Sequence, residues 1–425
     1  MKILVIEVAA LGYKTWQQFH SLPFWDQLNS CSLKTVFPAV TCTVQASFRT
    51  AAPPAEHGMI ANGFFNRKLR KTFFWEQASS IYSGSRIWDK FREDGGTVGQ
   101  ICWQQAIGND SDLILTPAPI HKHHGGMIQD FHARPEGLYN NLCKQIGRKF
   151  NLFSYWGPFT SEKSTSWITD STVELLKSGK ASDFQLVYLP HLDYEMQKTG
   201  PDSPKSKKAF SFTEKQIEKI FTAAKAAGYE VLIFGDYAIT EAHTAIHPNR
   251  ILKDAGLFNT RKIKSMLYPD IYTSPAFAMV DHQIAHIYID RPEHIQKVKD
   301  LFDKIPGVKN AYLNSEKIDH PASGEIILEA DNGYWFAYPW WKDKSEAPDY
   351  ATHVDIHSKP GFDPCELYME LWPPMSITTD TSKIKGTHGL INEKVFWGAT
   401  FDTKSPDSIL DGALHIKNLL TRSIK

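Results

Sequence analysis

Short apolar runs of strand length recur along the first part of the chain, and they are the feature that most constrains its fold. The runs are Ile3–Val8, Thr97–Cys102, Leu113–Leu115, Phe184–Leu189 and Val231–Phe234. Helical patterns lie between them, such as Thr213–Ala227, which ends just before Gly228. Strands that are apolar along their whole length are typical of a parallel sheet buried on both faces by helices. The pattern therefore predicts an α/β fold, a three-layer αβα sandwich around a largely parallel central sheet.

Polar or ionisable residues follow several of these runs. In sheets of this kind, binding and catalytic sites lie beyond the carboxyl ends of the strands. Glu7 lies at the end of the first run, Asp193 follows Leu189, and Asp236 follows Phe234. Thr41 follows a further expected strand end at Leu33–Phe37. We therefore expect these four side chains to lie at one edge of the sheet.

The pattern changes between about Arg261 and Trp341, where strands and one helix read as a separate small sheet. The expected elements are a strand Ala285–Ile289, a helix Glu293–Ile305, a strand Val308–Leu313, and a strand pair Glu325–Glu329 with Tyr334–Tyr338. A last strand and helix then complete the main sheet, at Val395–Gly398 and Ser408–Leu420. We predict a core made of residues 1–260 and 345–425, with a small α+β insertion, a cap, at 261–344.

The overall composition limits the kinds of partner that the chain is expected to bind. The chain of 425 residues carries 47 basic and 47 acidic side chains, so no net charge draws it to a nucleic-acid polymer or a membrane. No run approaches the ~20 apolar residues that a membrane helix needs. Its five cysteines are odd in number and widely spaced, which favours neither a disulfide framework nor a thiolate zinc site. We expect a cytoplasmic protein that acts on a small molecule; nothing in the sequence indicates an oligomeric state.

The segment from Phe37 to Phe64 predicts an anion site. It reads as a strand end, a turn at Pro38 and a short helix whose first turn carries Thr41. A hydroxyl at a helix N-terminus lies beside unpaired N–H groups and the positive end of the helix dipole, which together bind phosphate or another oxyanion. The alternative is that Thr41 or Thr43 is simply an N-cap.

The whole segment resembles the nucleophile region of the type I phosphodiesterase/nucleotide pyrophosphatase family, within the alkaline phosphatase superfamily. In that family a nucleophilic Thr opens a helix, the His of an HG pair follows, and an Asn that holds a phosphoryl oxygen comes next. Thr41, His57-Gly58 and Asn62 reproduce this order, at offsets of 16 and 5 residues. The resemblance implies an alkaline-phosphatase-like core with Thr41 and Asn62 as catalytic residues.

The resemblance also implies two divalent metal ions, most often zinc. One ion would be held by Glu7, Thr41, Asp236 and Tyr237, and the other by Asp193, Gln197 and His388 of the Gly386-Thr387-His388-Gly389 motif. The family has Asp at the first of these positions and His where this chain has Gln197 and Tyr237. Since the remaining ligands are rich in oxygen, Mn²⁺ or Mg²⁺ is the alternative to zinc.

Other histidines are candidate substitutes for the two missing imidazoles. His191 precedes Asp193 by two residues, so both would face one side of an extended strand; it is equally well a satisfied strand-end histidine. His357, beside Asp355, is a second candidate. His282 and His286 alternate with apolar residues and read as buried sheet residues, and the cluster His121, His123 and His124 reads as part of a solvated surface loop.

Taken together, these residues predict a metal-dependent hydrolase of phosphodiester or pyrophosphate bonds that forms a covalent phosphothreonine at Thr41. One alternative is a phosphonate or phosphomonoester hydrolase on the same scaffold. Another is a catalytically weakened member that binds a phosphorylated metabolite, a reading that the loss of two imidazoles keeps open. Phe64, Phe65 and Trp75 would stack a nucleobase or belong to the core.

Overall fold

The computed structural model describes residues 1–371 and 376–422, and a mixed eight-stranded sheet forms the centre of this part of the chain. The strand order is β2 (Asn29–Leu33), β21 (Val395–Ala399), β11 (Tyr229–Gly235), β1 (Lys2–Val8), β10 (Phe184–Leu189), β5 (Val98–Ile101), β6 (Leu113–Pro117) and β9 (Phe131–Arg134). The five strands from β11 to β6 are parallel, while β21 and β9 run antiparallel to their neighbours. The apolar runs recognised in the sequence are these five parallel strands, which confirms the predicted sheet.

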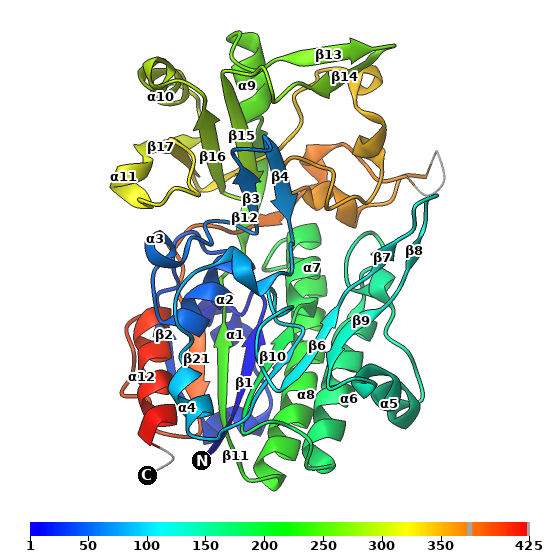
Figure 1. Cartoon of the computed structure of the whole chain (residues 1–425), viewed down its shortest axis with the longest axis vertical. Helices are drawn as coiled ribbons and strands as arrows, with labels where there is room; N and C mark the ends of the chain where they lie inside the picture. Colours follow the sequence, from blue (N-terminus) through cyan, green and yellow to red (C-terminus); the bar gives the residue numbers. More distant parts are fainter. Residues whose placement is uncertain (372–375, 423–425) are drawn as a thin grey trace.

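Helices cover both faces of this sheet (Figure 1). On one face lie α2 (Thr41–Thr50), α4 (Asp89–Glu93) and α12 (Ile409–Arg422), where the ring of Phe48 stacks on that of Phe234 at 4.9 Å. The other face packs against α6 (Glu162–Lys177) and α8 (Pro204–Ala226), with α1 (Tyr13–Phe19) and α5 (Leu138–Ile146) beside them. The predicted three-layer α/β fold is therefore confirmed.

A second sheet lies above the carboxyl ends of the central strands (Figure 1). It has the order β15 (Ala276–Asp281), β16 (Ile284–Ile289), β18 (Ile326–Ala330) and β17 (Val308–Leu313), and all its pairs are antiparallel. The expected pairing of Glu325–Glu329 with Tyr334–Tyr338 is wrong. β18 lies between β16 and β17, and β19 (Gly333–Phe336) instead pairs with β12 (Thr240–Ile246). Every residue of β18 is buried. A central position between β16 and β17 pairs both edges of this strand, which a hairpin with β19 alone would not do.

The second hydrophobic core also recruits residues from the N-terminal part of the chain. The hairpin of β3 (Gly63–Asn66) and β4 (Lys71–Phe74) packs here, and the ring of Phe65 lies 5.5 Å from Phe277 and 4.6 Å from Tyr288. Further members of this core come from Ile246 to Phe362. The boundaries 261–344 stay a prediction, but the core that surrounds the second sheet extends beyond them.

The remaining elements are short. They are α3 (Pro54–His57), α7 (His191–Thr199), α9 (Pro248–Asp254), α10 (Ile295–Phe302), α11 (Asn314–Lys317), β7 (Ile120–His121), β8 (Met127–Ile128), β13 (Thr260–Ile263), β14 (Met266–Pro269) and β20 (Gly386–Thr387). The helix expected over Glu293–Ile305 is thus shorter than predicted, and β2 ends at Leu33 rather than continuing to Phe37. None of the helices in residues 1–371 and 376–422 is both long and apolar enough to cross a membrane.

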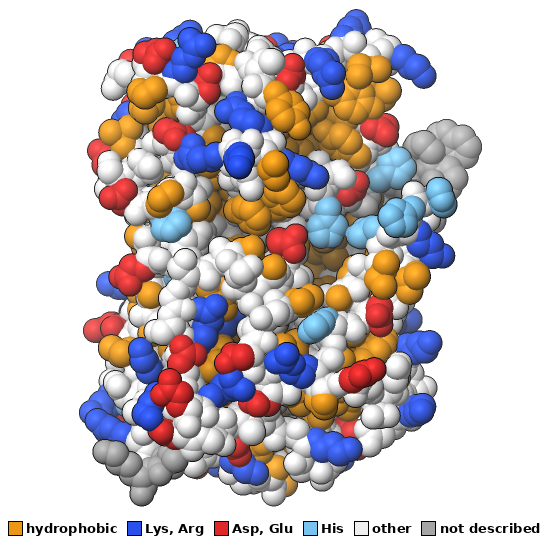
Figure 2. Space-filling view, in the orientation of Figure 1, with side chains coloured by type: hydrophobic (Ala, Val, Ile, Leu, Met, Phe, Trp, Pro, Cys, Tyr) orange, Lys and Arg blue, Asp and Glu red, His pale blue; other side chains and the backbone are white. Residues whose placement is uncertain are grey.

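Basic and acidic side chains are interspersed over the face drawn in Figure 2, without a large area of one sign. Histidine side chains gather at mid-height on the right of this face. The β7–β8 hairpin lies within the segment expected to be a loop; His121, His123 and His124 are exposed there, and the ring of His121 lies 5.5 Å from that of His357.

Candidate active site

The carboxyl ends of β1, β10 and β11, together with the start of α2, define one region between the central sheet and the second sheet. Thr41 is the first residue of α2 and is buried. Its Oγ1 donates a hydrogen bond to Asp236 Oδ2 at 3.2 Å and lies 3.4 Å from Tyr188 Oη. Val40 occupies the N-cap position without a side-chain cap. The hydroxyl of Thr41 is therefore turned toward a carboxylate instead of capping its own helix.

Asp236 is placed by a close approach of two loops. A Cβ atom at the preceding Gly235 would lie 2.1 Å from the carbonyl oxygen of Leu11, so only glycine fits there. The approach lets Asp236 Oδ1 accept from the N–H groups of Ala10 at 3.1 Å and Tyr237 at 2.9 Å. Burial raises the pKa of Asp236, the charge of Asp193 raises it further, and these backbone donors oppose the rise.

Asn62 connects the start of α2 to the second sheet. Its Oδ1 accepts from the N–H of Cys42 at 3.0 Å, while its own N–H and Nδ2 donate to Asp281 at 2.7 and 3.3 Å. An amide nitrogen carries two hydrogens, so one N–H of Asn62 stays available to a ligand. Asp281, the last residue of β15, is fully buried, and burial raises its pKa to about 6.

His57 fixes the loop that leads to Asn62. Its Nδ1 accepts from the N–H of Met59 at 3.0 Å, so Nε2 carries the proton and donates to Ser47 Oγ of α2 at 2.9 Å. Burial, reinforced by the charge of Arg49, lowers the pKa of His57 to about 3. The His-Gly pair thus has a structural part in the site: a neutral imidazole ties the loop to α2.

Asp193 lies on α7, and a different set of groups surrounds it. Tyr237 Oη donates to Asp193 Oδ1 at 3.0 Å, and Gln197 Nε2 donates to Oδ2 at 2.7 Å. His388 Nε2 lies 4.0 Å from Oδ1. Burial raises the pKa of Asp193 to about 7, against the lowering effect of the bonds from Tyr237 and Gln197. Thr41, Asp236, Tyr237, Asp193 and His388 thus form one connected cluster.

Four rings are stacked beside Asp193. The rings of Tyr237 and His388 are parallel at 3.6 Å, those of His388 and His282 lie 3.7 Å apart, and those of His282 and Phe362 lie 3.9 Å apart. His388 Nδ1 donates to the carbonyl of Ala39 at 2.7 Å, which leaves Nε2 as the acceptor nitrogen on the side of Asp193. The position of the His388 ring is therefore held on both faces and at one edge.

His282 shows where the sequence reading was incomplete. It is buried, as expected, but it lies in the two-residue turn between β15 and β16, with φ of 58°, rather than in the sheet. Its Nδ1 lies 2.7 Å from Asp281 Oδ1. His286 does lie in β16, within hydrogen-bond distance of the Ile60 carbonyl. The sequence pair Asp281-His282, an acid and a histidine at the tip of a hairpin, could have predicted that the second sheet contributes residues to this site.

The other candidates lie apart from this cluster or lack partners. Among the described residues, both carboxylate oxygens of Glu7 are buried without a hydrogen-bond partner; burial, followed by the charge of Asp236, raises the pKa of this side chain. His191 begins α7, so the extended strand assumed for it is wrong, and its ring lies 5.2 Å from that of Phe212. His357 lies beside His121.

The ligand set implied for two zinc ions is only partly matched. Within the described part of the chain, no group of three His, Cys, Asp or Glu side chains is arranged to hold a metal ion. At Asp193 both oxygens already accept from side-chain donors, so this half does not fit a zinc ion. Glu7, Asp236 and Thr41 offer only oxygen donors, which suit a hard cation better than zinc.

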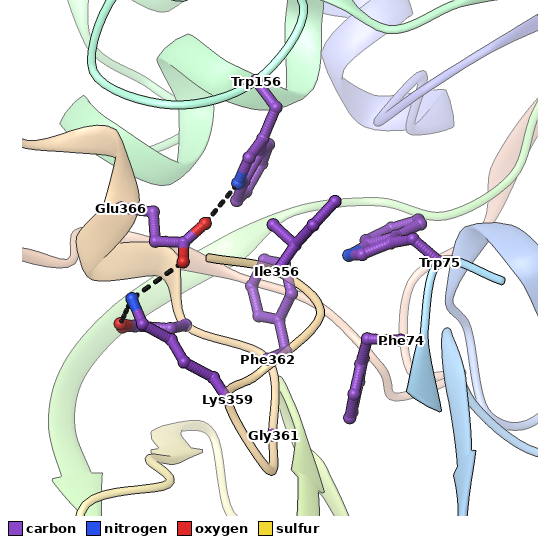
Figure 3. Close-up of a pocket in the computed structure, with 9 residues that line it drawn as sticks. Phe74, Trp75, Trp156, Ile356, Lys359, Gly361, Phe362 and Glu366 are labelled. Atoms are coloured by element: carbon purple, nitrogen blue, oxygen red, sulfur yellow. Dashed lines mark hydrogen bonds and ion pairs between the residues drawn. The ribbon is translucent and has the colours of Figure 1, made fainter. Parts of the chain in front are cut away.

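A small hollow adjoins the ring stack (Figure 3). Its lining residues are Phe74, Trp75, Trp156, Ile356, Lys359, Gly361, Phe362, Asp363 and Glu366. Lys359 is buried and pairs with Asp363 at 2.8 Å and Glu366 at 2.7 Å, and Trp156 donates to Glu366 at 2.6 Å. Of the aromatic residues expected to form a wall, Trp75 lines this hollow, whereas Phe65 is packed in the second core.

Comparison with known proteins matches residues 3–363 to the family model "Type I phosphodiesterase / nucleotide pyrophosphatase". Human ectonucleotide pyrophosphatase/phosphodiesterase 5 shares the fold at a TM-score of 0.61 and 16% identity, over 99% of this chain and 95% of that one. The phosphonoacetate hydrolase of Sinorhizobium meliloti 1021, in complex with phosphonoacetate, has a TM-score of 0.64 at 12% identity, over 98% of this chain and 95% of that one. An inactive variant of murine ectonucleotide pyrophosphatase/phosphodiesterase 5, in complex with AMP, has a TM-score of 0.59 at 14% identity, over 99% of this chain and 95% of that one. No curated protein matches the sequence.

Proposed function

The chain belongs to the type I phosphodiesterase/nucleotide pyrophosphatase family of phosphoric ester hydrolases, and from that premise we propose that it cleaves phosphodiester or pyrophosphate bonds of a small molecule through Thr41. The observation that carries the proposal is the hydrogen bond from Thr41 Oγ1 to Asp236 Oδ2 at the N-terminus of α2. A nucleophilic hydroxyl needs a neighbouring group that takes its proton, and a phosphoryl group needs N–H donors.

In the proposed reaction, Thr41 Oγ1 attacks phosphorus while its proton passes to Asp236 Oδ2. The bond from phosphorus to the leaving oxygen breaks and that oxygen keeps the electron pair, which gives a phosphothreonine. Water then displaces Thr41 from phosphorus and the hydroxyl regains a proton. The N–H of Thr41 and the remaining N–H of Asn62 would stabilise the phosphoryl oxygens, where negative charge is concentrated, while the N–H of Cys42 stays bonded to Asn62 Oδ1.

A divalent cation held by Thr41, Asp236 and Glu7 would lower the pKa of the threonine hydroxyl. The donors at this half are all oxygen atoms, which supports Mn²⁺ or Mg²⁺ over the zinc expected from the family.

A second candidate function is that of a weakened family member that binds a phosphorylated metabolite. It is favoured by one observation: each oxygen of Asp193 accepts a hydrogen bond from a side chain, Tyr237 at one and Gln197 at the other. Hydrolysis of a phosphonate, the kind of ligand bound by the bacterial structural neighbour, would use the same attack by Thr41 and is included in the assay below.

The test is a comparison of Thr41→Ala with Thr43→Ala on a chromogenic diester, a chromogenic monoester and phosphonoacetate. Thr43 is buried in the same helix, and its hydroxyl has no partner among the described residues, so its loss should leave most turnover. Loss of Thr41 should lower kcat by several powers of ten, because the covalent route closes. An active Thr41→Ala variant would refute the proposal. A wild-type protein inactive on all three substrates but able to bind them would favour the second candidate.

A further inference from the structure

The two residues that replace family imidazoles act on the same carboxylate. Tyr237 donates to Asp193 Oδ1 and Gln197 donates to Asp193 Oδ2, one donor to each oxygen. As metal ligands, both side chains would have to present an acceptor atom, the phenolate oxygen of Tyr237 and the amide oxygen of Gln197. Here both present a proton instead.

A buried carboxylate must be compensated by a cation or by hydrogen-bond donors. Asp193 is 6% exposed, and none of the described lysine or arginine side chains forms an ion pair with it. The phenol and the amide therefore take the place at Asp193 that a metal ion has in a site built from imidazoles. They stabilise the buried carboxylate through hydrogen bonds without supplying a Lewis acid.

Both donors are held firmly in place. Gln197 lies four residues after Asp193 on α7, so the helix itself brings the amide next to the carboxylate. The ring of Tyr237 lies parallel to that of His388 at 3.6 Å, and both residues are buried. A cation at Asp193 would have to displace two ordered donors.

The Thr41 half of the site differs in this respect. Neither oxygen of Glu7 has a partner within hydrogen-bond distance among the described residues, although the side chain of Gln45 lies near it. Asp236 accepts from the Thr41 hydroxyl at Oδ2 and from two backbone N–H groups at Oδ1. In the part of the chain that the structure describes, the Thr41 half thus offers a carboxylate without a donor, whereas at the Asp193 half the carboxylate receives two side-chain donors and Gln197 Oε1 is left without a partner.

We infer that Tyr237 and Gln197 replace a cation at Asp193, so that the active site holds no more than one divalent ion, at the Thr41–Asp236 half. The inference concerns the site of the proposed function, but it does not depend on turnover. A protein inactive on every phosphoester would refute the proposed function and leave the number of ions to be measured.

The experiment counts bound ions. The full-length protein is treated with a chelator and then titrated separately with Zn²⁺ and Mn²⁺, with elemental analysis after gel filtration. We expect at most one ion per chain. The double variant Tyr237→His/Gln197→His should bind one more ion than the wild type, because two imidazoles become available beside Asp193 and His388. His191→Gln is the control: it changes the buried histidine of α7, which lies apart from Asp193 and His388 in the ring contacts described, and it should leave the number of bound ions unchanged.

Two ions in the wild type, or no additional ion in a double variant that is folded by circular dichroism, would overturn the inference. A second measurement does not depend on the double variant. If Tyr237 ligated a metal, addition of Zn²⁺ to the wild type would produce tyrosinate absorption in the near ultraviolet. We expect no such band, and a band that is missing in Tyr237→Phe would also overturn the inference.

Discussion

The two halves of the candidate active site supply different hydrogen-bond donors to their carboxylates. Asp236 accepts from the hydroxyl of Thr41, a group whose proton must leave during the proposed reaction, whereas Asp193 accepts from Tyr237 and Gln197. The Thr41 half takes Thr41 and Asn62 from one segment, residues 37–64, in which the spacing of the family is intact, and Glu7 and Asp236 from the ends of two strands. The Asp193 half takes Asp193 and Gln197 from α7 and adds Tyr237 and His388, and its Gln197 and Tyr237 stand where the family pattern has His. The comparison teaches that a site can lose cation ligands and yet keep its carboxylate compensated.

The largest expected effect separates the two carboxylates by their role in the reaction. Asp236→Asn should lower kcat/KM by about 10²–10⁴-fold, since the acceptor for the Thr41 proton is lost. Asp193→Asn should cost less, because its partners are donors that do not take part in proton transfer. Steady-state kinetics of both variants would measure the ratio. Equal losses would remove the distinction between the halves.

The next effect concerns Asn62, the proposed phosphoryl-binding group of the Thr41 half. Asn62→Ala should lower kcat by about 10²–10³-fold, the usual cost of removing one donor to a developing oxyanion. Asp281→Asn, which alters the partner that Asn62 shares with His282, should reduce kcat less and in the same direction. If Asp281→Asn had the larger effect, Asp281 would act on the substrate directly.

A change at the Asp193 half should appear as lost stability. Tyr237→Phe removes one donor from a buried carboxylate and should lower the free energy of unfolding by about 1–3 kcal/mol. Tyr338→Phe is a matched control, because this tyrosine is equally buried and its hydroxyl has no partner among the described residues. Urea unfolding measures both. A Tyr237→Phe variant as stable as the wild type would mean that Asp193 is compensated in another way.

The last expected effect, small at neutral pH, is a pH dependence of the loop behind the Thr41 half. The pKa of His57 is lowered by burial to about 3 in the folded protein, against about 6.5 in an unfolded chain. Folding therefore favours the neutral imidazole, and this contribution to stability is fully present above pH 6.5. Between pH 6.5 and the folded pKa, the free energy of unfolding should fall by about 1.4 kcal/mol for each pH unit.

In His57→Gln this contribution should be missing, so that unfolding depends less steeply on pH between 6.5 and 4. His247 and His286, whose pKa values burial lowers to about 4, would still contribute a slope. Urea unfolding across this pH range would decide the matter. An unchanged slope would show that the imidazole of His57 is not held neutral by the fold.

Local sequence determined the central sheet and the start of α2. Apolar runs such as Val231–Phe234 are typical of strands buried on both faces in a covered parallel sheet, and Pro38 separates the preceding segment from the helix that begins at Thr41. The position of Asp236 directly after β11 followed from the same pattern.

Tertiary structure alone decided the rest of the site. Whether Tyr237 acts as a metal ligand or as a hydrogen-bond donor depends on its distance from Asp193, which lies 44 residues away in the chain. The turn Asp281-His282 reaches Asn62 and His388 only because the second sheet packs over the carboxyl ends of the central strands. Periodicity reports which face of an element is buried, but it contains no information about which distant side chain will be its neighbour, and that contact fixes where each proton lies.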